Sequence, residues 1–112
     1  MSPMPETSKL AQLRSKTDRQ LSSLVGVELE NGSTYARVAE AHYSLGDAGP
    51  GERAYNRALR AVKDCEALLP LLHRYLADDE RRRLEREAER LRAKLAFLAG
   101  RYGAQRRSAC CS

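Results

Sequence analysis

The sequence predicts an all-α protein, a small four-helix bundle with a helix-turn-helix hairpin in its middle. The chain has 112 residues, of which 42% are hydrophobic, and this suits a single domain. Aromatic residues are scarce, with five Tyr, one Phe and no Trp, so Leu, Ala and Val must build the core. Apolar residues also recur at a helical period in segments that Gly, Pro and capping residues separate.

The first predicted helix begins near Thr7 or Ser8, either of which can cap it, and ends at about Glu30. Its apolar stripe consists of Leu10, Leu13, Leu21, Leu24, Val25 and Leu29. Asn31 and Gly32 follow, a pair that tolerates the positive φ found at helix ends. We therefore expect the chain to turn there.

A second helix is predicted from a cap at Ser33 or Thr34 to about Leu45, where Gly46 ends it. The residues expected on its buried side are Tyr35, Val38, Ala39, His42 and Leu45. The segment from Gly46 to Gly51 holds three Gly and one Pro, which favours a loop over a helix. Because this loop is short, the helices on either side of it should form an antiparallel hairpin.

The third predicted helix runs from about Glu52 to Leu68 or Leu69. Its inward-facing residues are expected to be Ala54, Tyr55, Ala58, Leu59, Val62, Cys65 and Leu69. Pro70 has no amide proton and its ring clashes with the preceding turn of a helix. We therefore expect a new turn from Pro70 through Tyr75.

The last helix is predicted from a cap at Asp78 to about Ala99, with Gly100 as its stop. Spacings of four and three residues separate the apolar positions Leu84, Ala88, Leu91, Leu95 and Leu98. This heptad pattern fits either a coiled coil between two chains or a stripe that packs on the chain's own bundle. We favour packing within the chain, because the seam spans only about two heptads.

From Tyr35 to Lys63 the chain resembles one tetratricopeptide repeat, over about a quarter of its length. The resemblance is carried by Tyr35, Val38, Ala39, Gly46, Tyr55 and Ala58, and it departs at Gly51 and Lys63, where that family usually has Ala and Pro. It implies a protein-interaction role in which Ser33, Ala36, Glu40, Tyr43 and Ser44 line the ligand-facing surface. From this set we select Glu40, Tyr43 and Ser44 as the expected contacts with a partner protein.

The net charge of +5 suggests a competing function, nucleic-acid or anionic-surface binding. Residues 1–33 are neutral, residues 34–77 and 78–99 carry +1 each, and residues 100–112 carry +3. We therefore expect a nearly neutral helical domain over residues 1–99 and a basic flexible tail over residues 100–112. The residues that would bind phosphates are Arg81, Arg82, Arg83, Arg101, Arg106 and Arg107.

No residue pattern points to chemistry, so we expect no enzymatic activity, no metal and no cofactor. His42 and His73 have no ligand partner at the i, i+4 spacing of zinc sites, and Cys65 lies among apolar residues as a small hydrophobe. Cys110 and Cys111 resemble a lipidation signal, but the four-residue prenylation motif would need Cys at position 109, which is Ala109. We therefore do not expect a lipidated tail.

The sequence also favours a cytoplasmic protein with reduced thiols. Its amino end, Met1-Ser-Pro-Met-Pro-Glu, lacks the basic start and apolar run of a secretory signal. No window approaches the ~18 apolar residues of a membrane span, and three Cys cannot form a paired disulfide framework. The function we expect is that of a non-enzymatic interaction or assembly module, whose partner is another protein or a second copy.

Overall fold

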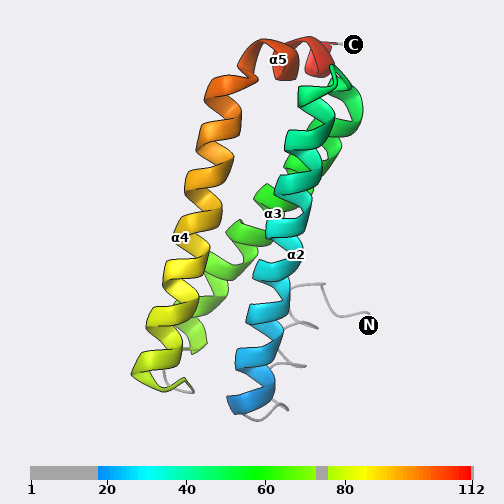
Figure 1. Ribbon diagram of the computed structural model, residues 1–112. Coiled ribbons are helices and arrows are strands. Elements are labelled where there is room, and N and C mark those ends of the chain that lie inside the picture. Colours follow the sequence, from blue (N-terminus) through cyan, green and yellow to red (C-terminus); the bar gives the residue numbers. More distant parts are fainter. Residues whose placement is uncertain (1–17, 73–75, 112) are drawn as a thin grey trace, which may run out of the picture.

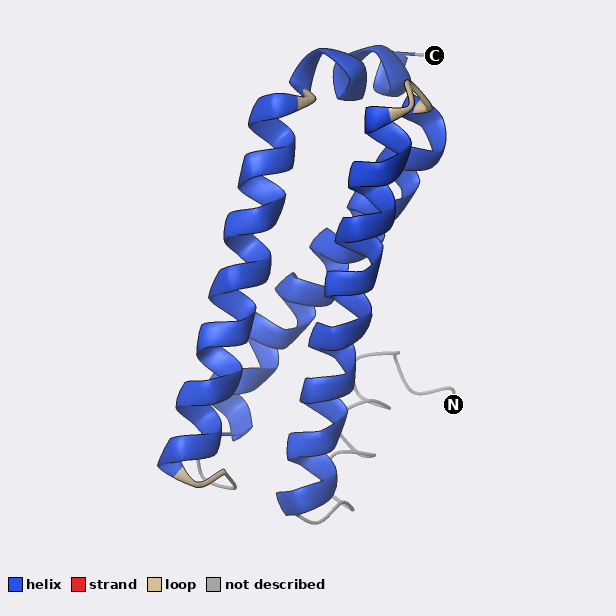
Figure 2. Ribbon diagram, viewed as in Figure 1, coloured by secondary structure: helices blue, strands red, loops and turns tan. Residues whose placement is uncertain are grey.

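The computed structural model describes residues 18–72 and 76–111, and every regular element in these residues is a helix. The elements are α2 (Asp18–Ser44), α3 (Ala48–Leu72), α4 (Asp78–Arg101) and α5 (Gly103–Cys111). Figure 2 shows the helices joined by short loops, with no strand in the described part. The prediction of a small all-α helical bundle is therefore confirmed.

The four helices pack as three long rods with a short helix across one end (Figure 1). α2 and α3 form an antiparallel hairpin, and α4 contacts both of them. α5 turns sharply away from α4 and lies over the end of the bundle where α2 meets α3. The helical hairpin predicted from Gly46 and its neighbours is present at this end of the molecule.

The core is entirely apolar among the described residues, with no buried polar or charged side chain. From α3 it takes Ala54, Tyr55, Ala58, Ala61, Val62, Cys65, Leu68, Leu69 and Leu72, and from α4 Leu84, Ala88, Leu91, Leu95 and Leu98. Complete burial of one Leu stabilises the fold by about 1.5–3 kcal/mol. The predicted inward faces of both helices are confirmed, and the heptad stripe of α4 packs within its own chain.

The predicted turn at Asn31 and Gly32 is wrong, because α2 continues through both residues to Ser44. Gly32 is buried, and a Cβ placed on it would lie 2.6 Å from Leu91 Cδ2 and 3.1 Å from Ala61 Cβ. This glycine therefore allows α2 to approach α3 and α4 closely. One uninterrupted helix replaces the two that the sequence predicted.

The hairpin turn is shorter than the predicted loop, since α3 already begins at Ala48. Gly46 has a φ of +82°, Gly46 N–H donates to Tyr43 O, and Asp47 N–H donates to His42 O. This is the Schellman arrangement, which satisfies the last carbonyls of α2. Pro50 lies in the first turn of α3, where a missing amide proton leaves no helical acceptor unpaired.

The two ends of α3 and α4 near residue 75 also differ from the prediction. α3 continues through Pro70 to Leu72, because Leu68, Leu69 and Leu72 are buried and hold the helix together around the proline. The rest of the predicted turn, together with His73 and Tyr75, lies outside the described residues. α4 is capped by Ala77 and not by Asp78, which occupies its first turn with Asp79 and Glu80.

The chain beyond Gly100 also differs from the expected flexible tail. α4 passes through Gly100 to Arg101, and the next residues form α5. This helix packs on α3, where polar side chains anchor it, as described below. The predicted start of the first helix near Thr7 or Ser8 and the apolar positions Leu10 and Leu13 lie outside the described residues.

Candidate functional site

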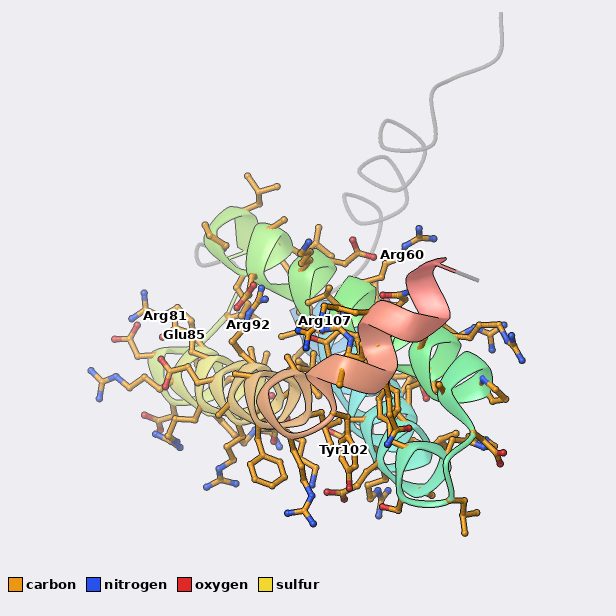
Figure 3. The ribbon with its side chains drawn as sticks, turned by 90° about the horizontal axis from the view of Figure 1, so that it is seen from above. Arg60, Arg81, Glu85, Arg92, Tyr102 and Arg107 are labelled. Carbon is orange, nitrogen blue, oxygen red and sulfur yellow. The ribbon has the colours of Figure 1, made fainter. Side chains whose placement is uncertain are left out.

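The densest group of polar contacts lies where α5 crosses the end of the α2–α3 hairpin. We call it the cap cluster, and its members are Tyr43, Glu52, Tyr55, Tyr102 and Arg106. Figure 3 looks down on α5 and shows it lying over the other helices, with Tyr102 at its start. The cluster combines residues of α2, α3 and α5 with the residue that joins α4 to α5.

Glu52 is the centre of the cap cluster. Its Oε2 accepts hydrogen bonds from Tyr43 OH at 2.7 Å and from Arg106 Nε at 2.9 Å. The guanidinium of Arg106 also lies 3.8 Å from the ring centroid of Tyr55. Because the Arg106 and Glu52 side chains are only 25% and 19% exposed, this pair is well shielded from solvent.

Tyr43 and Tyr102 of the cluster stack, with ring centroids 5.2 Å apart and ring planes at 17°. Gln105 Nε2 of α5 donates to Tyr43 O at 3.1 Å, which fixes α5 against the end of α2. A Cβ at Gly51 would lie 2.8 Å from the Tyr43 ring, so glycine leaves room for that ring. The departure from the tetratricopeptide pattern at Gly51 therefore has a local structural reason.

Two side chains of the cluster have raised pKa values. Burial and the hydrogen bond to Glu52 raise the pKa of Tyr43 well above its ordinary range. The pKa of Arg106 is also raised: its partial burial is the largest single effect and opposes the charge, but the hydrogen bond to Glu52 together with the electrostatic interactions with Tyr55, Glu52 and Tyr43 outweighs it. At neutral pH Tyr43 is therefore a protonated phenol and Arg106 a cation. Both donate hydrogen bonds to Glu52, and these contacts link α2, α3 and α5.

The three residues expected to contact a partner lie near the same end of α2 and are engaged within the chain. Both oxygens of Glu40 accept from Lys94 Nζ at 2.9 Å, and Ser44 Oγ lies 3.1 Å from Tyr102 OH. The side chain of Tyr43 is only 1% exposed, so it belongs to the interior. The helices α4 and α5 thus cover this face of α2, and a partner role for the exposed Ser44 and half-buried Glu40 stays a prediction.

The arginines proposed to bind phosphates do not form one surface. Arg81 lies 3.7 Å from Asp78 and 3.9 Å from Glu85, Arg83 pairs with Glu80, and Arg106 pairs with Glu52. Arg81 lies near the start of α4 and Arg101 is its last residue, a separation of roughly 30 Å along the helix. The two basic groups therefore lie at opposite ends of α4, and several of their charges are already paired.

No metal site is found among the described residues, where no three His, Cys, Asp or Glu side chains gather. His42 Nδ1 lies 3.6 Å from Asp47 Oδ2 at the end of α2, and buried Cys65 lies 3.9 Å from Val25 O. The side chains of Cys110 and Cys111 lie outside the described part. None of the described helices has the length and apolar character that crossing a bilayer requires.

Two open grooves flank α4, and both mix charges of opposite sign. A groove of about 480 Å³ between α2 and α4 carries Arg37, Arg83 and Arg90 beside Glu30 and Glu87. A second groove of about 540 Å³ between α3 and α4 is lined by Glu66, Glu85 and Glu89 with Arg81. The first groove thus has three basic and two acidic side chains and selects weakly for the sign of a ligand, whereas the second has three acidic and one basic side chain and disfavours anions.

The outward side of α2 is unusual because it carries no charge. Its residues follow one another at spacings of four, three, four, three and four, and we call them the outer α2 stripe: Val27, Asn31, Thr34, Val38, Ala41 and Leu45. All six are exposed, with Val27 at 51%, Val38 at 40% and Leu45 at 77%. In a chain with 31% charged residues, an uncharged outer stripe from Val27 to Leu45 is a candidate contact surface.

The stripe is not apparent from the sequence, because a helix break at Asn31 and Gly32 would place Val38 and Leu45 on the buried side of a separate helix. The buried side of α2 is formed instead by Val25, Leu29, Ala36, Ala39 and Tyr43. Those residues lie on the opposite side of the helix from the stripe, about half a turn around the helix axis. The 4-3 spacing was a usable signal, but only for a helix that continues through Gly32.

Comparison of this chain with protein-family models, with curated proteins and with solved structures finds no match.

Proposed function

We propose that this protein is a non-enzymatic interaction or assembly module that binds another polypeptide through the outer α2 stripe. The observation that carries the proposal is the exposure of Val27, Val38 and Leu45 on a helix face without a charged residue. Contact with a second chain would remove this apolar surface from water, which is the main driving force of protein association.

The shape of the stripe supports a protein partner over a small molecule. Five of its positions lie on α2 and Leu45 directly follows the helix, so the stripe extends over about 27 Å, and no enclosed pocket interrupts it. A small ligand needs a concave site that surrounds most of its surface. A long, narrow apolar line is instead the kind of surface that another helix covers.

The resemblance to a tetratricopeptide repeat agrees with an interaction role but would place the contact elsewhere. In that family the ligand-facing residues would be Ser33, Ala36, Glu40, Tyr43 and Ser44. In this chain Ala36 and Tyr43 are buried, and Glu40 is bound to Lys94. We therefore assign the contact to the opposite side of α2, in a protein that we expect to be cytoplasmic.

Nucleic-acid binding through Arg81, Arg82, Arg83 and the tail is the alternative, and the ion pairs disfavour it. A phosphate would have to displace Glu80 from Arg83 and Glu52 from Arg106. These contacts reduce the number of arginines that are free to release counterions from a nucleic acid.

The proposal is tested by photocrosslinking in the source cell. A photoreactive amino acid replaces Val38 in the stripe, and a matched variant carries it at Lys63, which is exposed on α3. We expect adducts with a second polypeptide, of either the same or another sequence, from position 38 and not from position 63. Equal labelling at both positions, or no adduct at position 38, contradicts the proposal.

A further inference from the structure

We infer that the outer α2 stripe is covered by a second copy of this chain, with the two α2 helices antiparallel across a two-fold axis. This inference rests on the proposed function and names its partner. Its basis is that the stripe and the charged residues beside it in one copy match the same residues in a second copy that runs in the opposite direction.

The spacing of the stripe favours a helix as the occupant. Intervals of four, three, four, three and four residues keep the positions from Val27 to Leu45 on one slowly winding line. A partner helix with the same repeat can follow that line, and in the antiparallel register described below the two stripes meet from Val27 to Val38. The α2 helix of a second copy has this repeat by definition.

The charges beside the stripe indicate an antiparallel arrangement. Glu30 and Arg37 are seven residues apart and therefore lie on the same flank of the stripe, both exposed. No ion pair is formed by either side chain with another residue in the described part of the chain. In an antiparallel pair centred near the level of Ser33, Glu30 of each copy lies close to Arg37 of the other, so one interface contains two ion pairs.

A parallel arrangement lacks this match. It would bring equivalent residues to the same level, and Glu30 and Arg37 differ in level by about 10 Å. The isologous geometry of a two-fold dimer instead uses each contact twice.

The same register places compatible side chains along the seam. Val27 of one copy packs on Val38 of the other, and Asn31 lies opposite Thr34, whose polar groups can form hydrogen bonds with each other. The two Val-Val contacts lie on either side of this polar centre. A seam with few large apolar residues predicts a weak dimer, whose population depends on the protein concentration.

The test is a charge exchange, read out by sedimentation equilibrium of the full chain over a range of concentrations. We expect the mass of the wild-type protein to rise from 12.5 kDa toward twice that value. Glu30→Arg and Arg37→Glu should each weaken the dimer at least tenfold, because like charges then meet across the axis. The double variant, and an equimolar mixture of the two single variants, should regain dimerisation.

Matched controls exchange exposed charges away from the stripe. Arg60→Glu on α3, labelled in Figure 3, and Glu89→Arg on α4 should dimerise like the wild-type protein. Unchanged far-ultraviolet circular dichroism shows that every variant is folded. Val38→Glu provides a second, charge-independent disruption of the seam.

Self-association is overturned if the wild-type protein keeps a mass of 12.5 kDa at all concentrations, or if the mixture of single variants stays monomeric. A monomer that still gives crosslinks from position 38 to a different polypeptide removes the second copy but retains the proposed interaction face. The absence of both dimer and crosslink removes the two proposals together.

Discussion

Gly32 of α2 lies against Leu91 of α4, so closely that a Cβ on the glycine would come within 2.6 Å of Leu91 Cδ2. Ala61 of α3 lies at the same point, 3.1 Å from that Cβ position. The three long helices therefore meet at a residue without a side chain. The close approach of the three helices depends on this glycine. Four contacts between helices, including this one, lead to predictions about stability.

The first prediction compares Gly32 with Gly26 in the same helix. Gly32→Ala should lower the free energy of unfolding by about 1 kcal/mol, because overpacking outweighs the gain in helix propensity. Gly26→Ala should raise it by about 0.5–1 kcal/mol, since a Cβ there meets nothing within 4 Å. Urea denaturation measures both, and the same sign for the two variants would contradict a close contact at Gly32.

The second prediction concerns the Glu52–Arg106 pair that anchors α5. Because both side chains are well shielded, a double-mutant cycle of Glu52→Gln and Arg106→Met should give a coupling energy of about 1–3 kcal/mol. The exposed Glu66–Arg92 pair serves as the control, and its coupling should be below about 1 kcal/mol. Similar coupling in the two cycles would show that α5 is not held by this contact.

The third prediction follows from the raised pKa of Tyr43 in the folded state. The unfolded chain ionises this phenol above pH ~10, whereas the folded chain keeps it protonated. Its contribution to stability is therefore present at neutral pH and is lost as the pH rises above that value. Wild-type protein should lose stability more steeply than Tyr43→Phe in denaturation experiments above pH ~10, and parallel curves would exclude the effect.

The fourth prediction concerns Glu80, whose pKa is lowered by hydrogen bonds from Ser22 and Arg83. The stabilisation is present at neutral pH and is lost as the pH falls through the folded-state pKa. Glu80→Gln and Ser22→Ala should each lower the urea midpoint at pH 7, with a smaller difference from wild type near pH ~3. A difference that stays constant with pH would assign the loss to packing instead.

The faces of α3 and α4 could be predicted because each is a regular amphipathic helix. The five apolar heptad positions of α4 and most of the inward positions of α3 follow from spacing alone. The path of α2 could not be predicted in this way, because Asn31 and Gly32 form a strong local turn signal. Contacts with Leu91 and Ala61, which are distant in the sequence, give Gly32 a different role.

The candidate site also combines features that local sequence predicts with features that depend on contacts between distant residues. Tyr43 was predicted to contact a partner protein, but it is buried, and its burial depends on Tyr102 and on α5, almost sixty residues later in the chain. Glu52 and Arg106 carried no recognisable motif, since their partnership exists only when α5 folds over α3. The residues of the outer α2 stripe share one side only because α2 is a single helix that continues through Asn31 and Gly32.

The sequence by itself determined that this protein is all-α, where the hairpin turns, and which sides of α3 and α4 are apolar. These properties depend on local terms, namely helical periodicity, the positive φ of Gly46 and the first-turn position of acidic residues. Only the tertiary structure decided that α2 is one helix, that α5 is anchored by Arg106, and that Val27 and Val38 face outward. The physical reason is that each of these depends on free energy from contacts between distant residues, which outweighs the local preference of the backbone.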